Sequence, residues 1–340
     1  MYLDSGYLDM AKIINTDATF VFVVGARGIG KTYGALKYLI EKGDKFMLMR
    51  RTQLQCDLVS KPDLSPLKSP LNDMGLDFKA VPISRQNSAY YLVQGDETSS
   101  TPFCYTAALS TFSNLRGFDA SDVDYLVYDE FIPQKQERPI KEEAGAFYNC
   151  YETMNRNREL SGRKPIKAIL LANSFDMANP LFISLGLVMR AEKMVKTGQS
   201  KYIDKTRGLA LYIPQKSPVS DKKRKTALYK LTDKSGDYSR MALDNVFVND
   251  TPDNVITKRL IEYVPVVKIG EIVIYKHKSN TTYYVSRHLT GTPKNSYTMS
   301  DNDRKRFVRQ YGYLWQKFMN NQVYFENYLC QVLFDKALAL

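Results

Sequence analysis

The side chains best suited to chemistry lie in a glycine-rich segment near the amino terminus. Residues 25–32 read GARGIGKT, a complete G-x-x-x-x-G-K-[ST] pattern, between an apolar run and a helical pattern. Glycines let successive backbone N–H groups turn toward one point where phosphate oxygens bind, Lys31 adds positive charge there, and Thr32 offers a hydroxyl to Mg²⁺. For Arg27, a contact with the terminal phosphate and simple solvent exposure are both open. The predicted phosphate-binding residues are Gly25, Arg27, Gly28, Gly30, Lys31 and Thr32.

A second candidate element is an apolar segment that ends in two acids. Residues 123–128 read VDYLVY and are followed by Asp129 and Glu130. In hydrolytic P-loop enzymes the first acid orients the Mg²⁺ shell, and a second polar residue positions the attacking water. No NKxD-type guanine-reading motif is present, which favours ATP over GTP. We therefore predict ATP and Mg²⁺ as cofactors, with Thr32 and Asp129 at the metal and Lys31 and Glu130 in catalysis.

Other polar residues along the chain could complete such a site. The apolar run 168–172 ends at Asn173, which either senses the terminal phosphate or simply ends a strand. Residues 154–159 read MNRNRE, and an arginine from a neighbouring subunit is a usual stabiliser of phosphoryl-transfer transition states. Arg156 and Arg158 both fit this role, and a solvated helical face is the alternative for the pair.

These candidates need a scaffold, and the apolar pattern predicts an α/β domain. Wholly apolar segments separated by helical patterns indicate a sheet covered on both faces. The predicted strands are 19–24, 46–49, 89–93, 103–108, 123–128 and 168–172, and the predicted helices are 31–42 and 142–159.

Positive charge is concentrated in the last 140 residues. Residues 201–340 contain 24 Lys and Arg against 13 Asp and Glu, a net charge of +11, whereas residues 1–200 have a net charge of +1. This distribution is typical of a polyanion-binding region, with a merely soluble basic surface as the alternative. No apolar run reaches 18 residues and the start lacks a secretory signal, so we expect no membrane span and a cytoplasmic location.

The composition of the chain becomes polar and basic near residue 217. The basic stretch 221–225, DKKRK, is typical of a linker, and a smaller unit follows beyond about residue 251. In that unit, 269–275 and 282–286 are predicted strands, and 301–340 is predicted to be mostly helical. We predict a P-loop ATPase domain over 1–219, a linker or lid over 220–251 and a small domain over 252–340.

In this order and spacing, the motifs resemble the DNA-packaging ATPases of small tailed phages of the phi-29 type. The resemblance covers most of residues 15–260 and thins over the last 80. The segments that carry it are GARGIGKT (25–32), MRR (49–51), VYDEF (127–131), NRNRE (155–159), LANSFDMANP (171–180) and, more weakly, LDN-F (243–247).

The resemblance implies a RecA/terminase-like, additional-strand P-loop ATPase that works as a DNA translocase. Such a protein would form a homomeric ring, usually of five, on the phage portal, and push double-stranded DNA into a preformed capsid in the host cytoplasm. A structural RNA is a further candidate partner.

The resemblance also extends to individual residues. Lys31 and Thr32 match the phosphate loop, and Asp129 and Glu130 match the acidic pair. By the same resemblance, the arginine finger acting in trans falls on Arg156. Arg116 matches a basic position thought to act across the subunit interface. Where the family can place another basic residue after MRR, Gln53 stands here, which puts a trans role for that position in doubt.

The carboxy-terminal piece resembles a vestigial nuclease domain of the ribonuclease H type, an α+β fold. Two-metal nucleases need several convergent carboxylates, one of them on the first strand. The predicted first strand, 266–276, offers only Glu271. We therefore expect nucleic-acid or portal binding there rather than cleavage.

Two other function classes stay open on the sequence. One is another ring ATPase that acts on nucleic acid, such as a helicase or a partition motor. The other is a non-enzymatic DNA-binding or portal-docking protein with a silent phosphate loop.

Overall fold

The computed structural model describes residues 1–115, 121–134, 137–173, 176–232, 243 and 254–339. The chain divides into two compact units, one of 1–181 with 193–248 and the other of 182–192 with 249–340. The described part of the predicted linker forms helices α8 (Pro218–Lys223) and α9 (Ala227–Leu231), which belong to the first unit. The predicted domain boundaries themselves stay a prediction.

The first unit is built on a mixed sheet whose strand order, over the described residues, is β3-β4-β6-β2-β7-β8-β1-β10-β9, with β5 paired to β4. The strands from β6 to β10 in this order are parallel, and the outer strands are antiparallel. The bounds are β1 Phe20–Gly25, β2 Phe46–Arg50, β3 Asp77–Pro82, β4 Ser88–Gln94, β5 Glu97–Thr98, β6 Cys104–Ala108, β7 Tyr125–Asp129, β8 Lys167–Asn173, β9 Lys201–Asp204 and β10 Leu209–Tyr212.

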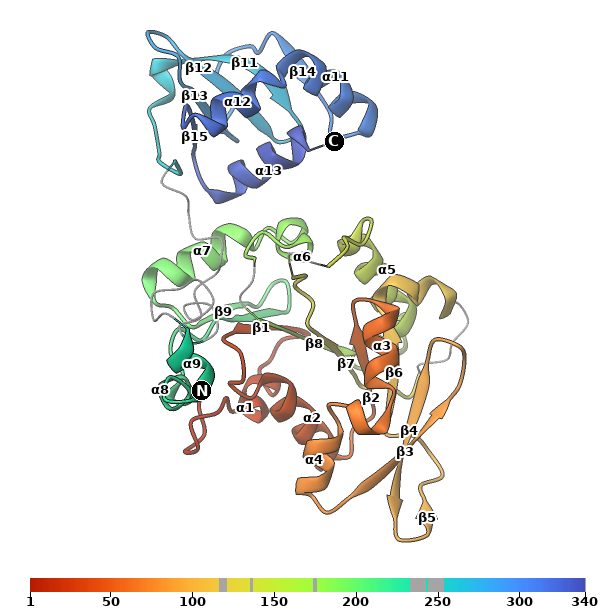
Figure 1. The fold of residues 1–340 in the computed structure, drawn as a ribbon. Coiled ribbons are helices and arrows are strands. Elements are labelled where there is room, and N and C mark those ends of the chain that lie inside the picture. Colours follow the sequence, from red (N-terminus) through yellow and green to blue (C-terminus); the bar gives the residue numbers. More distant parts are fainter. Residues whose placement is uncertain (116–120, 135–136, 174–175, 233–242, 244–253, 340) are drawn as a thin grey trace. The chain divides into compact units, whose positions relative to one another are not determined.

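Strand β8 lies between β1, which leads into the phosphate loop, and β7, which carries the acids (Figure 1). This is the additional-strand arrangement, so the predicted RecA/terminase-like fold class is confirmed. The carboxyl ends of the three strands meet at one edge, because Gly25 pairs with Asn173 and Asp129 pairs with Leu171. Ligands of open α/β sheets bind at this edge.

Helices cover both faces of this sheet. Val21 of β1 and Ile169 of β8 share one hydrophobic core with Leu36 and Leu39 of the helix α2. Besides α8 and α9, the helices of the first unit are α1 Met10–Ile14, α2 Lys31–Lys42, α3 Gln53–Val59, α4 Lys68–Asp73 and α5 Glu143–Asn155. The helices α6 Pro180–Ser184 and α7 Val188–Thr197 each contain residues of both units.

Helix α5 covers the opposite face. Tyr128 of β7 stacks on Phe147 of α5 with ring centroids 5.8 Å apart, and Phe20 of β1 packs on Tyr151 of α5 at 4.8 Å. Successive strand residues point to opposite faces, and helices cover both faces, so the interior residues of each central strand are apolar on both sides.

The second unit is an α+β domain, the class that was expected. Its sheet has the order β14-β11-β12-β13-β15, in which β11, β12 and β13 form an antiparallel meander. The bounds are β11 Tyr263–Ile269, β12 Ile272–His277, β13 Tyr283–Ser286, β14 Asn295–Tyr297, β15 Val323–Phe325, α11 Asp301–Tyr311, α12 Tyr313–Met319 and α13 Tyr328–Leu338.

One expectation for this unit is wrong. The predicted strand 269–275, and the longer first strand 266–276, are two strands joined by a two-residue turn at Gly270 and Glu271. Gly270 has φ 53°, a left-handed conformation that suits a tight hairpin turn. Glu271 consequently lies in a turn, where it forms an ion pair of 2.7 Å with Arg287.

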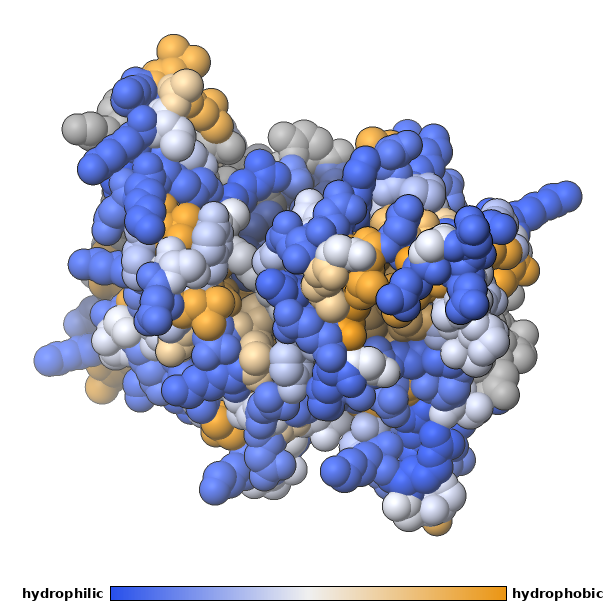
Figure 2. All heavy atoms as spheres, turned by 90° about the horizontal axis from the view of Figure 1, so that it is seen from below, coloured by the Kyte–Doolittle hydropathy of each residue, from blue (hydrophilic) through white to orange (hydrophobic). Residues whose placement is uncertain are grey.

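The surface seen in Figure 2 is predominantly hydrophilic, with small apolar areas between charged side chains. Among the helices that the structure describes, none combines the length and the apolar content needed to cross a bilayer.

Candidate active site

The glycine-rich segment forms a tight loop between β1 and α2. Gly28 and Gly30 have φ values of 66° and 91°, which side-chain-bearing residues rarely adopt. Gly30 caps the amino end of α2, so the helix begins at Lys31 with its free N–H groups directed at the loop. This arrangement is a ready-made anion site, because those N–H groups and the helix dipole both favour negative charge.

The amine of Lys31 is buried in the loop. Its Nζ donates to the carbonyl oxygens of Gly25 at 2.9 Å and Ala26 at 2.7 Å, and to Oδ1 of Asn173 at 3.1 Å. Burial lowers the pKa of Lys31 to about 7, and the nearby cations Lys223 and Arg27 act in the same direction, against the opposing effect of the two acids. A bound polyphosphate would reverse this shift by supplying negative charge.

The acidic pair lies where β7 ends, beside the loop. Thr32 Oγ1 donates to Asp129 Oδ1 at 2.9 Å. Glu130 follows with φ 58°, a left-handed backbone that costs a non-glycine residue about 1–2 kcal/mol. Strained residues of this kind cluster at functional sites.

The oxygens of Thr32 and Asp129 fit a magnesium ion. Mg²⁺ prefers oxygen ligands and is commonly held by one or two carboxylates together with substrate phosphates and water. Among the described residues there is no cluster of three or more His, Cys, Asp or Glu side chains suited to a metal. A magnesium site here would therefore draw further ligands from the phosphates of a nucleotide.

These groups face one cavity of about 490 Å³, within the range of small-molecule sites. It is lined by every predicted phosphate-site residue except Gly25, by both acids and by Asn173. The lining consists of Arg27, Gly28, Gly30, Lys31, Thr32, Tyr33, Asp129, Glu130, Ala172, Asn173, Lys223 and Tyr229.

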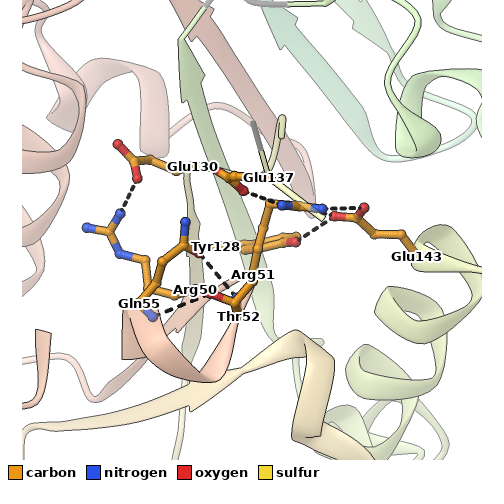
Figure 3. Close-up of polar contacts among 8 residues, drawn as sticks. All are labelled: Arg50, Arg51, Thr52, Gln55, Tyr128, Glu130, Glu137 and Glu143. Carbon is orange, nitrogen blue, oxygen red and sulfur yellow. Dashed lines mark hydrogen bonds and ion pairs between the residues drawn. The ribbon is translucent and has the colours of Figure 1, made fainter. Parts of the chain in front are cut away.

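Arg50, at the end of β2, pairs with both acids, a role that the sequence did not reveal. Its guanidinium lies 2.9 Å from Asp129 Oδ2 and 2.8 Å from Glu130 Oε2. Figure 3 shows Arg50 directed toward Glu130 while its neighbour Arg51 points the other way. The register of β2 on β7 explains the contact. Met49 of β2 pairs with Tyr128 of β7, so the residues that follow them, Arg50 and Asp129, lie side by side.

Arg51 is completely buried and ties β2 to α5. Its Nε and Nη2 bond the two carboxylate oxygens of Glu143 at 2.7 Å and 2.9 Å, and its Nη1 pairs with Glu137 (Figure 3). The hydroxyl of Tyr128 also lies 3.4 Å from Glu143. Two adjacent arginines at the end of β2 therefore bind different acids. Arg50 pairs with Asp129 and Glu130, and Arg51 pairs with Glu143 in the first turn of α5.

Comparison with known proteins gives a family for this arrangement. The podovirus DNA encapsidation protein (Gp16) family matches residues 3–336. The chain belongs to this family. The predicted resemblance is thereby confirmed.

Two related phage proteins are DNA packaging proteins. A DNA packaging protein of Bacillus phage B103 is 27% identical over 339 residues, which cover 94% of this chain and 97% of that protein. A DNA packaging protein of Bacillus phage phi29 is 28% identical over 245 residues, which cover 71% of this chain and 65% of that protein.

Solved structures share the fold of this encapsidation-family chain. The bacteriophage Phi-29 viral genome packaging motor assembly matches with a TM-score of 0.65 and 20% identity, over 97% of this chain and 99% of that one. The Phi-28 gp11 DNA packaging motor matches with a TM-score of 0.63 and 20% identity, over 98% of each chain. At these identities the likeness concerns the fold.

The two candidate finger arginines have different surroundings in this member of the family. Arg158 is buried and donates to the carbonyl oxygens of Ser121 at 2.9 Å and Val123 at 2.6 Å. Arg156 is exposed and caps α5 with φ 43°. Neither lines the cavity of the chain itself.

The other predicted positions have mixed outcomes. Asn173 lies at the end of β8, where it was predicted, and its side-chain oxygen accepts a hydrogen bond from Lys31 of the loop. Arg116 lies outside the described residues. Gln53 bonds Asp57 and the backbone of Gln86, within its own subunit.

Lys223 and Tyr229 were not predicted for this site. They come from residues 220–251, the predicted linker or lid, about 190 residues beyond the loop. No local motif marks them, so only the folded chain reveals their position.

Proposed function

We propose that this chain is an ATP-hydrolysing motor that translocates double-stranded viral DNA into a preformed capsid. The observation that carries the proposal is the convergence of Lys31, Thr32, Asp129, Glu130 and Asn173 on one cavity at the carboxyl edge of the sheet. Membership of the encapsidation family supports DNA as the substrate of the motor.

Each group in the cavity has a defined task in this proposal. The loop N–H groups and Lys31 bind the phosphates. Thr32 and Asp129 would hold Mg²⁺, which would supply positive charge beside the phosphates. Glu130 orients and polarises the attacking water. In this structure Oε2 of Glu130 lies 2.8 Å from Nη1 of Arg50, so this oxygen can bind the attacking water only after the ion pair opens.

We further propose that transition-state charge is stabilised from a neighbouring subunit by Arg156 rather than Arg158. Exposure at the end of α5 suits a residue that acts across an interface, whereas Arg158 is buried and bonds the carbonyl oxygens of Ser121 and Val123 in its own chain. With the family resemblance, this proposal leads us to expect a homomeric ring, usually a pentamer, on the portal in the host cytoplasm. A structural RNA is a further candidate partner of the ring.

The test is an ATPase assay with and without double-stranded DNA and empty capsid, combined with nuclease protection of the DNA. We expect DNA-stimulated hydrolysis and ATP-dependent protection of duplex DNA by the capsid. Strand separation without protection would favour a helicase. Absence of turnover under all conditions would favour a docking protein with a silent loop.

A further inference from the structure

Helices α8 and α9 place two side chains against the phosphate loop. Lys223, the last residue of α8, donates a hydrogen bond from Nζ to the carbonyl oxygen of Arg27. Its amine also lies 5.3 Å from the ring centroid of Tyr229, which belongs to α9 and is buried. The aromatic face therefore supports the cation from one side while the loop contacts it from the other.

The loop is shaped to accept this amine. A β-carbon built on Gly28 would lie 3.0 Å from Nζ of Lys223, and Gly28 also has a left-handed φ of 66°. A side chain at this position would thus both strain the backbone and press on the amine. The glycine at position 28 therefore leaves room for the amine of Lys223 to approach the loop closely.

The charges around the cavity leave an excess of positive charge. The charged lining that the structure describes consists of three cations and two carboxylates: Arg27, Lys31, Lys223, Asp129 and Glu130. Both carboxylates are already paired with a fourth cation, Arg50. Four cations against two acids match the charge of about −2 carried by ATP with one Mg²⁺ better than the smaller charge of ADP with Mg²⁺.

Lys223 also bears an electrostatic cost in its present position. Burial and the positive charge of Arg27 lower its pKa. A group that is destabilised as a cation in this way gains most from a neighbouring anion.

We propose that Lys223 is a phosphate-binding cation in addition to Lys31, supplied by α8 of the same chain, which exchanges its bond with the Arg27 carbonyl for a bond to the terminal phosphate of ATP. The inference rests on the proposed ATPase function and deepens it. Because the contact exists only while the terminal phosphate is present, α8 and α9 distinguish ATP from ADP, and Lys223 adds selectivity that Lys31 alone does not provide.

The test measures equilibrium binding of a slowly hydrolysed ATP analogue and of ADP, both with Mg²⁺, to the full chain. Lys223→Met removes the charge and keeps the aliphatic stem over Tyr229. We expect its affinity for the ATP analogue to fall about tenfold or more, as for loss of a charge-assisted bond, while its ADP affinity changes less than about twofold. Lys222→Met is the matched control, because Lys222 is an exposed neighbour on the same helix that does not line the cavity.

A second variant, Tyr229→Leu, removes the aromatic support and should lower the affinity for the ATP analogue in the same direction but by less. Melting curves without nucleotide check that each variant folds. The inference is overturned if Lys223→Met loses both nucleotides equally, loses neither, or behaves like Lys222→Met.

Failure of the inference differs from failure of the proposed function. Suppose that the wild-type chain binds and hydrolyses ATP, and that Lys223→Met has the same ratio of affinities for the ATP analogue and ADP as the wild-type chain. Only the role of Lys223 is then refuted. If the wild-type chain binds neither nucleotide, the ATPase proposal itself fails.

Discussion

Lys31 combines burial with three hydrogen-bond acceptors, and this combination makes its charge dependent on what occupies the cavity. Its pKa is about 7 in this structure against an ordinary value of 10.5, with burial as the main cause. Phosphates would raise the pKa again. Nucleotide binding should therefore be coupled to proton uptake.

We predict that ATP binding with Mg²⁺ weakens as the pH rises from about 7.5 to 9, by up to tenfold per pH unit. The sign follows because Lys31 is increasingly neutral in the free protein above pH 7 and must gain a proton to bind phosphate as a cation. Calorimetric titration at pH 8.5 in two buffers of different ionisation enthalpy should show uptake approaching one proton per site. Binding without proton uptake at that pH would contradict the assigned role of the amine.

At the residue scale, local patterns in the sequence predicted most of the residues that line the cavity. The loop residues, the acidic pair and Asn173 were all found from local patterns, because phosphate binding needs a contiguous loop and an apolar strand that ends in acids. Arg50 was missed because its contact with Asp129 depends on the neighbouring strand order, and Lys223 was missed because it arrives from a distant helix. Local spacing carries no information on either contact.

The end of α5 separates two arginines that look equivalent in the sequence. Arg158→Ala should destabilise the fold by roughly 1–3 kcal/mol, because the buried carbonyl of Val123 loses its bond from Arg158. The exposed carbonyl of Ser121 keeps a bond from Arg163. Arg156→Ala should destabilise the fold less than Arg158→Ala does, because Arg156 is exposed, yet lower ATP turnover on the order of 10³-fold. Denaturant unfolding and steady-state hydrolysis of both variants provide the check. The opposite pattern would make Arg158 the finger.

Helix α5 also depends on Arg51 at its other end. Arg51→Met should destabilise the first unit by about 3–5 kcal/mol, because it leaves the buried carboxylate of Glu143 unpaired. The double variant Arg51→Met with Glu143→Leu should recover much of this loss, since no buried charge remains at Glu143. Urea unfolding measures both. Equal destabilisation by the single and double variants would show that the helix does not depend on this ion pair.

At the element scale, the central strands of the first unit agree with the prediction to within one or two residues, and α2 agrees at both ends. Wholly apolar runs are clear signals because these strands are buried on both faces. The hairpin at Gly270 was missed because apolar residues continue on both sides of the turn. The short strand β15 was hidden within a largely helical region.

At the scale of the whole molecule, the net charge of +11 over residues 201–340 predicts a DNA affinity that falls steeply with salt. Each neutralised phosphate contributes roughly −0.9 to the log–log slope, so several contacts should give a slope of about −3 or steeper, similar for unrelated duplexes. Binding titrations between 50 mM and 200 mM salt test this.

The comparison variants remove the same number of charges from different regions. Lys305→Ala with Arg309→Ala, exposed positions on α11, should make the slope shallower by up to about 2. Lys79→Ala with Arg85→Ala, exposed positions in the nearly neutral half, should leave it unchanged. Affinity that does not respond to salt would assign the basic half to a protein partner.

The central claim is that the cavity at the edge of the sheet hydrolyses ATP with Glu130 acting on the water. The most direct measurement compares ATP binding and hydrolysis by Glu130→Gln with those of the wild-type chain, and Lys31→Ala serves as the binding-deficient control. We predict that Glu130→Gln binds ATP with nearly wild-type affinity and hydrolyses it on the order of 10²–10⁴-fold more slowly, because the glutamate acts only on the attacking water. Turnover close to that of the wild-type chain in Glu130→Gln would contradict the account.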